Sequence, residues 1–245
     1  MDIQGLTLCS RFSYPPNSLS LCGPEKQKDL NWYSGTLNSD KGNREILEEF
    51  STLYPYLTLI ASQNKIKDPF DTRVVEAYWL GNNLLSKVPL IPFVNHLSEK
   101  IALKKKIKKS SLEKAFIKIS KGALPNHSFH VLNIYKRTGN LDILHDVESL
   151  DACIINWGKV LSVQKNEIIV DTNPLTIKEG ILKFGKSRQR ILMSQGYNDK
   201  LFQTVITGDW ITYHWGYFCQ KLSNIQLKNL IYYTKLSVNF ANNKL

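Results

Sequence analysis

Cys153 and His214 are the residues of this 245-residue chain whose types and surroundings are best suited to holding a metal ion. Cys153 stands directly before a β-branched run, and His214 lies within a second run that follows Gly208-Asp209, so we expect both on strands. A cysteine at the start of one strand and a histidine within another can meet across the face of a small barrel. Thiolate and neutral imidazole suit iron and also zinc. Two protein ligands leave coordination positions open, which favours a carrier over a closed structural site.

Further residues are candidates for an additional site. They are Cys22, Glu76, His127, His130 and Cys219. His127 and His130 share a face if their segment is helical and oppose each other if it is extended. Glu76 lies in an otherwise apolar segment, where a carboxylate needs a cation or a functional role, and Arg73 is an adequate partner. Cys219, five residues after His214, fits either a further ligand or a core position.

Apolar side chains recur at helical spacing in several segments of residues 1–148, which we expect to be mainly helical. One such stripe covers Arg44–Ser62, and Pro55 is expected to kink or split it because proline cannot donate a backbone hydrogen bond. Predicted helix starts are Asp71, Pro92 and the capping-box pair Ser110 and Glu113. Gly81-Asn82 is expected to end the helix that carries Glu76.

The pattern changes after Val147, where short β-branched runs replace the helical stripes. Ile154–Val163 and Ile168–Thr172 flank a polar turn and predict a hairpin. Further runs cover Ile181–Phe184, Arg190–Met193 and Trp210–Trp215. Several short strands with turn residues between them indicate a small barrel.

A C-terminal helix is predicted from Ser223, with Gln226 completing a capping box, and its apolar face is expected to lie on the barrel. The expected fold class is therefore α+β. A mainly helical domain covers residues 1–148, and a small β-barrel with a C-terminal helix covers residues 149–245.

The chain is basic, with a net charge of +11 and a pI near 9.4. A dense block contains Lys104, Lys105, Lys106, Lys108 and Lys109. No aromatic residues are interleaved with this block, so it reads as a solvated helix end or loop and argues against nucleic-acid binding. The sequence shows no signal peptide and no apolar stretch near the roughly 20 residues that cross a bilayer. We expect a cytoplasmic protein with reduced cysteines and no membrane partner.

Two segments resemble HypC-type proteins, the metallochaperones of nickel–iron hydrogenase maturation. The first segment matches at Cys153, Gly158, Lys159 and Val160, and the second at Gly208, Trp210, His214, Gly216 and Tyr217. The predicted hairpin between them and the capped helix after them also resemble that family, over about residues 151–240. Cys153 is internal here, and Trp157 stands where the family has proline, so the resemblance implies a variant carrier with an altered client.

The HypC-type resemblance implies an OB-like barrel with a C-terminal helix. It implies an iron centre bearing cyanide and carbon monoxide, with Cys153 as the essential contact and His214 as the second ligand. A HypD-like maturation protein and the hydrogenase large-subunit precursor would be the partners. Such a protein carries and transfers a metal centre without turnover of its own.

Other segments resemble an uncharacterised prokaryotic family over the whole chain, which brings no activity with it. They are Leu21–Pro24, Val75–Asn82 and His127–Val131, together with the Trp-Gly-Lys and Asp-Trp…His segments.

Two alternatives to a carrier stay open. The first is a metal-dependent enzyme whose site combines His127, His130 or Glu76 with Cys153 and His214, because clefts between domains are common ligand sites. The second is a basic module that binds nucleic acid, which rests on charge alone.

Overall fold

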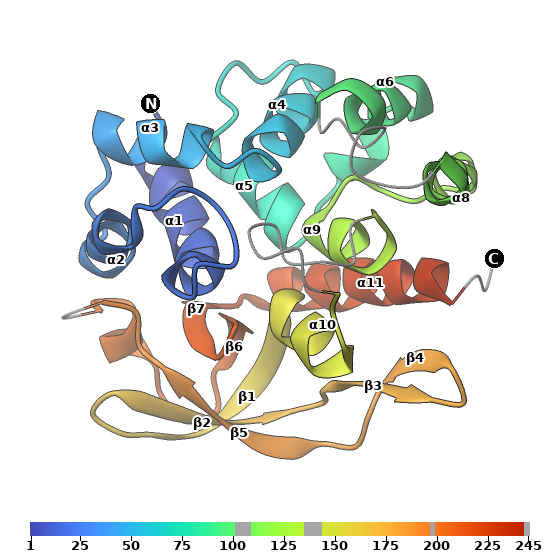
Figure 1. Cartoon of the computed structure of the whole chain (residues 1–245). Helices are drawn as coiled ribbons and strands as arrows, with labels where there is room; N and C mark the ends of the chain where they lie inside the picture. Colours follow the sequence, from blue (N-terminus) through green and yellow to red (C-terminus); the bar gives the residue numbers. More distant parts are fainter. Residues whose placement is uncertain (101–108, 135–143, 197–198, 243–245) are drawn as a thin grey trace.

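The computed structural model describes residues 1–100, 109–134, 144–196 and 199–242, and it has the mixed α+β architecture that the sequence predicts. Figure 1 shows the helices of the first half gathered above the strands of the second half. The helical elements that precede the strands are α1 (Ile3–Ser18), α2 (Gln27–Thr36), α3 (Lys41–Glu48), α4 (Leu53–Gln63), α5 (Thr72–Trp79), η1 (Leu85–Lys87), α6 (Leu90–Asn95), η2 (His96–Lys100), α8 (Lys109–Ser120), α9 (His127–Phe129), η3 (His130–Ile134) and α10 (Val147–Cys153). A further short helix, η4 (Phe202–Thr204), lies among the strands.

Aspartate side chains begin several of these helices. Asp2, Asp40 and Asp71 each accept a hydrogen bond from a backbone N–H in the first turn of α1, α3 and α5 respectively. These N–H groups have no partner within the helix, so the caps stabilise the helix starts. The start at Asp71 and the end of α5 near Gly81, whose φ is +88°, are both as predicted.

The predicted helix over Arg44–Ser62 is two helices, α3 and α4, and the chain breaks before Pro55 rather than at it. Pro55 and Pro92 both lie in the first turn of a helix, where a missing N–H costs no hydrogen bond. Ser110 lies within α8, but the residues directly before Lys109 lie outside the described part of the chain, so the helix start predicted at Ser110 stays a prediction.

Five strands form a closed barrel in the order β1-β2-β5-β7-β6. They are β1 (Asn156–Val163), β2 (Glu167–Thr172), β5 (Arg188–Met193), β6 (Trp210–His214) and β7 (Tyr217–Lys221). Neighbours are antiparallel except β5 and β7, and β1 pairs with β6 to close the barrel. A five-stranded Greek-key barrel of this kind is OB-like. A separate hairpin of β3 (Leu175–Lys178) and β4 (Ile181–Phe184) extends from one end (Figure 1).

The C-terminal helix, α11 (Asn224–Ala241), begins with the predicted capping box: the Ser223 hydroxyl accepts from the Gln226 N–H, and the Gln226 side chain accepts from the Ser223 N–H. Its packing differs from the prediction. α11 lies mainly against α9 and η3 rather than on the barrel. Ser237 of α11 makes two of these contacts. Its carbonyl oxygen accepts from the Asn133 side chain, and its hydroxyl donates to the Asn126 side-chain oxygen.

The largest hydrophobic cluster contains residues from both halves of the chain, including Phe12, Trp79, Ile155, Cys219 and Leu230. The division into independent domains at residue 148 therefore stays a prediction.

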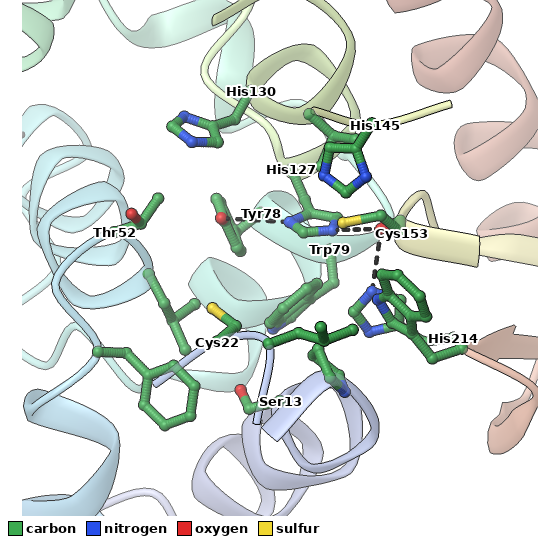
Figure 2. A pocket seen from close by; sticks show the side chains of 16 residues that line it. Ser13, Cys22, Thr52, Tyr78, Trp79, His127, His130, His145, Cys153 and His214 are labelled. Atoms are coloured by element: carbon green, nitrogen blue, oxygen red, sulfur yellow. Dashed lines mark hydrogen bonds between the residues drawn. The ribbon is translucent and has the colours of Figure 1, made fainter. Parts of the chain in front are cut away.

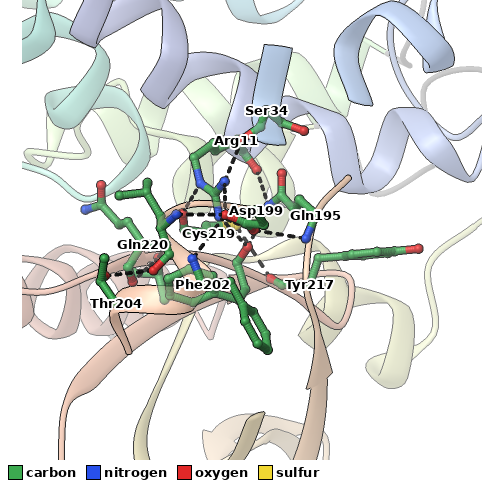
Figure 3. A network of polar contacts seen from close by, with 12 residues as sticks. Arg11, Ser34, Gln195, Asp199, Phe202, Thr204, Tyr217, Cys219 and Gln220 are labelled. Atoms are coloured by element: carbon green, nitrogen blue, oxygen red, sulfur yellow. Dashed lines mark hydrogen bonds and ion pairs between the residues drawn. The ribbon is translucent and has the colours of Figure 1, made fainter. Parts of the chain in front are cut away.

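A buried polar network also joins the two halves (Figure 3). Arg11 of α1 forms a bidentate ion pair with Asp199, with both N–O distances 2.9 Å. The same guanidinium donates to the carbonyl oxygens of Ser34 and of Cys219 in β7. A buried guanidinium needs all its donors satisfied. Arg11 therefore holds α1 against Asp199 and against β7.

No helix among the described residues is long and apolar enough to cross a membrane. Within the basic block, Lys104, Lys105, Lys106 and Lys108 lie outside the described residues, and Lys109 is the first described residue of α8.

Candidate functional site

Three potential metal ligands converge where the helical region meets the barrel. His127 begins α9, Cys153 ends α10 and His214 ends β6. Their ligand atoms all lie within 4.8 Å of one another. Figure 2 shows both imidazoles and the thiol gathered on one side of a cavity. The pair Cys153 and His214, expected from the sequence to meet, is thus in contact, and His127 joins them from the helical region.

Cys153 does not start a strand, as the sequence suggested, but is the last residue of α10. Asp146 caps this short helix by accepting from the Ser149 N–H, and β1 begins only at Asn156. The helix end explains the geometry, since the last carbonyls of a helix have no partner within it. The Cys153 carbonyl oxygen is therefore free to face the two imidazoles.

Both imidazoles contact this one carbonyl oxygen. The Nε2 atoms of His127 and His214 lie 2.8 Å and 2.9 Å from the Cys153 oxygen. Each opposite ring nitrogen has its own partner. Nδ1 of His127 lies 3.3 Å from the Tyr78 hydroxyl, and Nδ1 of His214 lies 2.7 Å from the Phe12 carbonyl oxygen.

The contacts of His214 conflict with each other for a neutral ring. A neutral imidazole carries one N–H and one lone pair, so His214 can donate to only one of its two carbonyl partners. Whichever ring nitrogen carries the N–H, the lone pair of the other faces a carbonyl oxygen, either that of Phe12 or that of Cys153. Such a contact between two lone pairs is repulsive unless a cation shares it.

Burial governs the protonation of all three groups. It lowers the pKa of His214 to about 4, against the opposing effect of the carbonyls of Phe12 and Cys153. Burial also lowers the pKa of His127 well below its usual value, and the neighbouring His214 adds to that effect. Burial raises the pKa of the Cys153 thiol to about 12, with the nearby thiol of Cys22 as the next cause. Without a bound cation the site therefore holds two neutral imidazoles and a neutral thiol.

The three groups form one wall of a cavity of about 90 Å³. Its other walls come from α1, the segment after it, the start of α4, α5 and η3. Among the described residues that line it are Ser13, Cys22, Thr52, Tyr78, Trp79, His130, His145 and Trp215. None of the described lining residues is Asp, Glu, Lys or Arg.

Apart from His127, the additional candidates named from the sequence fall into two groups, those that line the cavity and those that lie elsewhere. Cys22 and His130 line the cavity but lie outside the group of three ligands, and His130 Nδ1 lies 3.1 Å from the Tyr56 hydroxyl. His127 and His130 both lie in helical turns, and both are buried. Glu76 and Cys219 lie elsewhere.

Glu76 has a different partner from the expected one. Arg73 pairs with Asp71, 2.7 Å away, and the Glu76 carboxyl contacts Gln226 of α11 instead. Burial raises the pKa of Glu76. Cys219 is buried in the Arg11 network, where the Gln195 amide contacts its sulfur. Neither residue reaches the three-ligand site.

The other residues of the two segments that resemble HypC-type proteins shape the barrel and do not belong to the three-ligand site. The two motifs lie side by side, since Gly158 and Lys159 of β1 pair with Ile211 and Trp210 of β6. A Cβ on Gly158 would come within 2.9 Å of the Val170 side chain, so only glycine fits there. Gly208 and Gly216 have φ of +94° and +82° in the turns that flank β6, a conformation that favours glycine.

Sequence reasoning missed Tyr78, Trp79 and Trp215 as parts of the site. The Trp79 ring lies 4.6 Å from the His127 ring and 5.9 Å from the His214 ring. Trp215 is held at φ +49° beside Cys153, and its backbone N–H donates to the Ala152 carbonyl oxygen. Trp215 could have been found from the sequence, because it directly follows His214. Tyr78 could not, because no local pattern links it with His127, 49 residues later.

Neither a curated protein nor a solved structure matches the chain. One family model matches residues 1–245, which is the whole chain. The expectation of an uncharacterised family is thereby confirmed, and the chain belongs to DUF6390, a family of unknown function.

Proposed function

We propose that this protein binds one transition-metal ion through His127, Cys153 and His214 and leaves a coordination position open toward the cavity. The observation that supports this best is that both ring nitrogens of His214 face carbonyl oxygens, Nδ1 that of Phe12 at 2.7 Å and Nε2 that of Cys153 at 2.9 Å. With Nδ1 donating to Phe12, a metal ion bound by Nε2 beside the Cys153 carbonyl would relieve the conflict, because the Nε2 lone pair would then face a cation.

The outer partners of the imidazoles also fit metal ligation. A histidine ligand usually donates its second N–H to a carbonyl or another acceptor, which fixes the ring and its tautomer. Phe12 provides such an acceptor for His214, and the Tyr78 hydroxyl provides one for His127. Both Nε2 atoms then carry lone pairs that can bind the same ion as the Cys153 sulfur, in place of their contacts with the Cys153 carbonyl oxygen.

The ligand set narrows the choice of metal. Two imidazoles and one thiolate suit zinc and iron, and carboxylate-preferring ions such as magnesium and calcium do not fit. Three protein ligands with an open position are typical of zinc sites that bind exogenous molecules, whereas structural sites use four. The cavity beside the three ligands gives such a molecule room. This arrangement favours a metal-dependent reaction or ligand exchange over a purely structural role.

Metal analysis of matched variants tests the proposal. The purified wild-type protein, reconstituted with zinc or ferrous iron, should hold about one ion per chain by mass spectrometry of the elements. Cys153→Ala and His214→Gln should lose it. Cys219→Ala and His130→Gln change the same residue types outside the three-ligand group and should retain it. Equal metal content in all four variants would refute the proposal, as would a wild type that binds none.

A second candidate is the carrier role that the HypC-type resemblance implies. The two ligands of that resemblance, Cys153 and His214, line one cavity and meet at the Cys153 carbonyl, which is the observation in its favour. In this role the cargo is an iron centre with cyanide and carbon monoxide. A HypD-like protein and a hydrogenase large-subunit precursor would be its partners in the cytoplasm, where the four free cysteines stay reduced.

Infrared spectroscopy separates the two candidates. Protein purified without oxygen after co-expression with the maturation partners should show cyanide and carbon monoxide bands if it is a carrier. Cys153→Ala should abolish them. A wild type that binds zinc or iron but never shows these bands would leave the metal-site proposal intact and remove the carrier.

A further inference from the structure

We infer that the cavity beside the three-ligand site is a binding site for a small monoanion of about two to four non-hydrogen atoms, held between the open metal position and the Tyr78 hydroxyl. This inference rests on the proposed metal site and adds the class of molecule that the site takes.

The size limit comes from the cavity. Its volume is about 90 Å³, whereas an engineered apolar cavity of about 150 Å³ is known to hold benzene, with six non-hydrogen atoms. A ligand that fills the smaller cavity has fewer atoms than benzene. The described lining includes the buried side chains of Phe50 and Leu53, so a larger molecule held wholly within the cavity would have to displace core residues.

The charge of the ligand follows from the lining. A divalent ion bound by one thiolate and two neutral imidazoles retains one net positive charge. A buried charge needs a partner. None of the described lining residues carries a carboxylate that could supply the counter-charge there. A monoanion at the open position supplies it.

Tyr78 provides a hydrogen-bond donor to this anion. When His127 Nε2 binds a metal, its Nδ1 carries the proton and donates to the Tyr78 oxygen, 3.3 Å away. The hydroxyl hydrogen of Tyr78 is then available to another acceptor, and the Tyr78 side chain lines the cavity (Figure 2). Hydrogen bonds to charged groups are stronger than those between neutral groups.

Tyr56 offers a matched control for Tyr78. It is also fully buried, and its hydroxyl also contacts a histidine, His130, through Nδ1 at 3.1 Å. It is not among the residues that line the cavity. Replacing either tyrosine by phenylalanine removes the same atom from a similar environment.

The test uses the full chain loaded with cobalt(II), whose visible spectrum reports its ligands. Azide and thiocyanate are monoanions of three non-hydrogen atoms each, and both should change the spectrum saturably. Benzoate, a much larger monoanion, should not. Tyr78→Phe should bind azide about 10- to 100-fold more weakly, the range expected for a lost hydrogen bond to a charged group, and Tyr56→Phe should match the wild type.

The possible outcomes separate a failure of the anion site from a failure of the metal site on which it rests. A cobalt spectrum of the three-ligand site that azide leaves unchanged would overturn the anion site and leave the metal site standing. Benzoate binding as well as azide, or equal weakening in both tyrosine variants, would also overturn it. A wild-type protein that gives no cobalt spectrum would overturn both.

Discussion

At the scale of single residues, Cys153 holds the site together with two different groups. Its carbonyl oxygen contacts the Nε2 atoms of His127 and His214, and its thiol lies within 4.8 Å of both. The carbonyl is available because α10 ends at this residue. The residue type could be chosen from the sequence, but the carbonyl contact could not, since it depends on where a short helix stops.

Metal binding should release a proton from Cys153. Burial raises the pKa of this thiol to about 12, so it is protonated at pH 7, and only the thiolate binds metal. We expect about one proton released per ion bound, because both imidazoles are already neutral. Calorimetric titrations with zinc in buffers of different ionisation enthalpy measure this number. Metal uptake without proton release would mean that Cys153 is not a ligand.

The metal-free protein should lose stability as the pH falls below about 6.5. The folded-state pKa of His214 is about 4, below its usual value of 6.5, so the unfolded chain binds more protons between these values. Stability is fully present above pH 6.5 and declines toward pH 4, by about 3 kcal/mol for His214 alone.

Urea unfolding of the metal-free protein at several pH values measures this decline. His214→Gln cannot titrate and should show a shallower decline than the wild type over the same range. Identical slopes for the two proteins would contradict a buried neutral His214.

At the scale of elements, the end of α5 places Tyr78 and Trp79 against His127. Gly81 allows the helix to end there, because its backbone can adopt a positive φ. Gly81 has φ +88°, and a Cβ there would lie 2.0 Å from the Tyr233 ring of α11. The Tyr233 hydroxyl also donates to the Asn82 carbonyl, so the turn and α11 are closely joined. The sequence indicated this helix end correctly, because Gly-Asn is a frequent helix terminator.

Gly81→Ala should therefore destabilise the fold by more than about 1 kcal/mol, through both the left-handed backbone and the clash. Gly122→Ala is the matched control: Gly122 also has positive φ, at +98°, but nothing lies within 4 Å of its Cβ position. Thermal unfolding of the two variants measures the difference. A loss in Gly122→Ala as large as in Gly81→Ala would show that the contact with Tyr233 contributes nothing.

The predictability of the elements follows their local signals. β-branched runs and a polar turn predicted the β1–β2 hairpin, and Ser223 with Gln226 predicted the start of α11. The apolar stripe over Arg44–Ser62 predicted a single helix, although the chain forms α3 and α4 there, because the apolar spacing continues in phase across both helices. The surface on which α11 packs could not be predicted, since an apolar face does not specify its partner.

At the scale of the whole molecule, the site exists only while α1 stays packed against β6 and β7 and His127 of α9 stays against Cys153 and His214. Phe12 follows Arg11 in α1, so the ion pair that binds Arg11 to Asp199 also places the Phe12 carbonyl against His214. This arrangement joins positions more than 180 residues apart. Nothing in the local sequence pairs them. His127 likewise appeared from the sequence only as one of several additional candidates, because its contact with Cys153 depends on how α9 and α10 pack.

Asp199→Asn should cost about 3–5 kcal/mol of stability, the usual loss when one partner of a buried ion pair is removed. Asp209→Asn is the control, because Asp209 pairs with Lys221 at the surface and should cost less than about 1 kcal/mol. Denaturant unfolding gives both values. Similar small losses in the two variants would mean that the Arg11–Asp199 pair does not hold α1 to the barrel.

X-ray absorption spectroscopy of the zinc-loaded protein tests the metal site most directly. The spectrum should require one sulfur ligand at about 2.3 Å and two imidazole nitrogens at about 2.0–2.1 Å, the distances of cysteine and histidine ligation. The sulfur contribution should disappear in Cys153→Ala and persist in Cys219→Ala. A wild-type spectrum with only nitrogen and oxygen ligands, or one that Cys153→Ala leaves unchanged, would contradict the site.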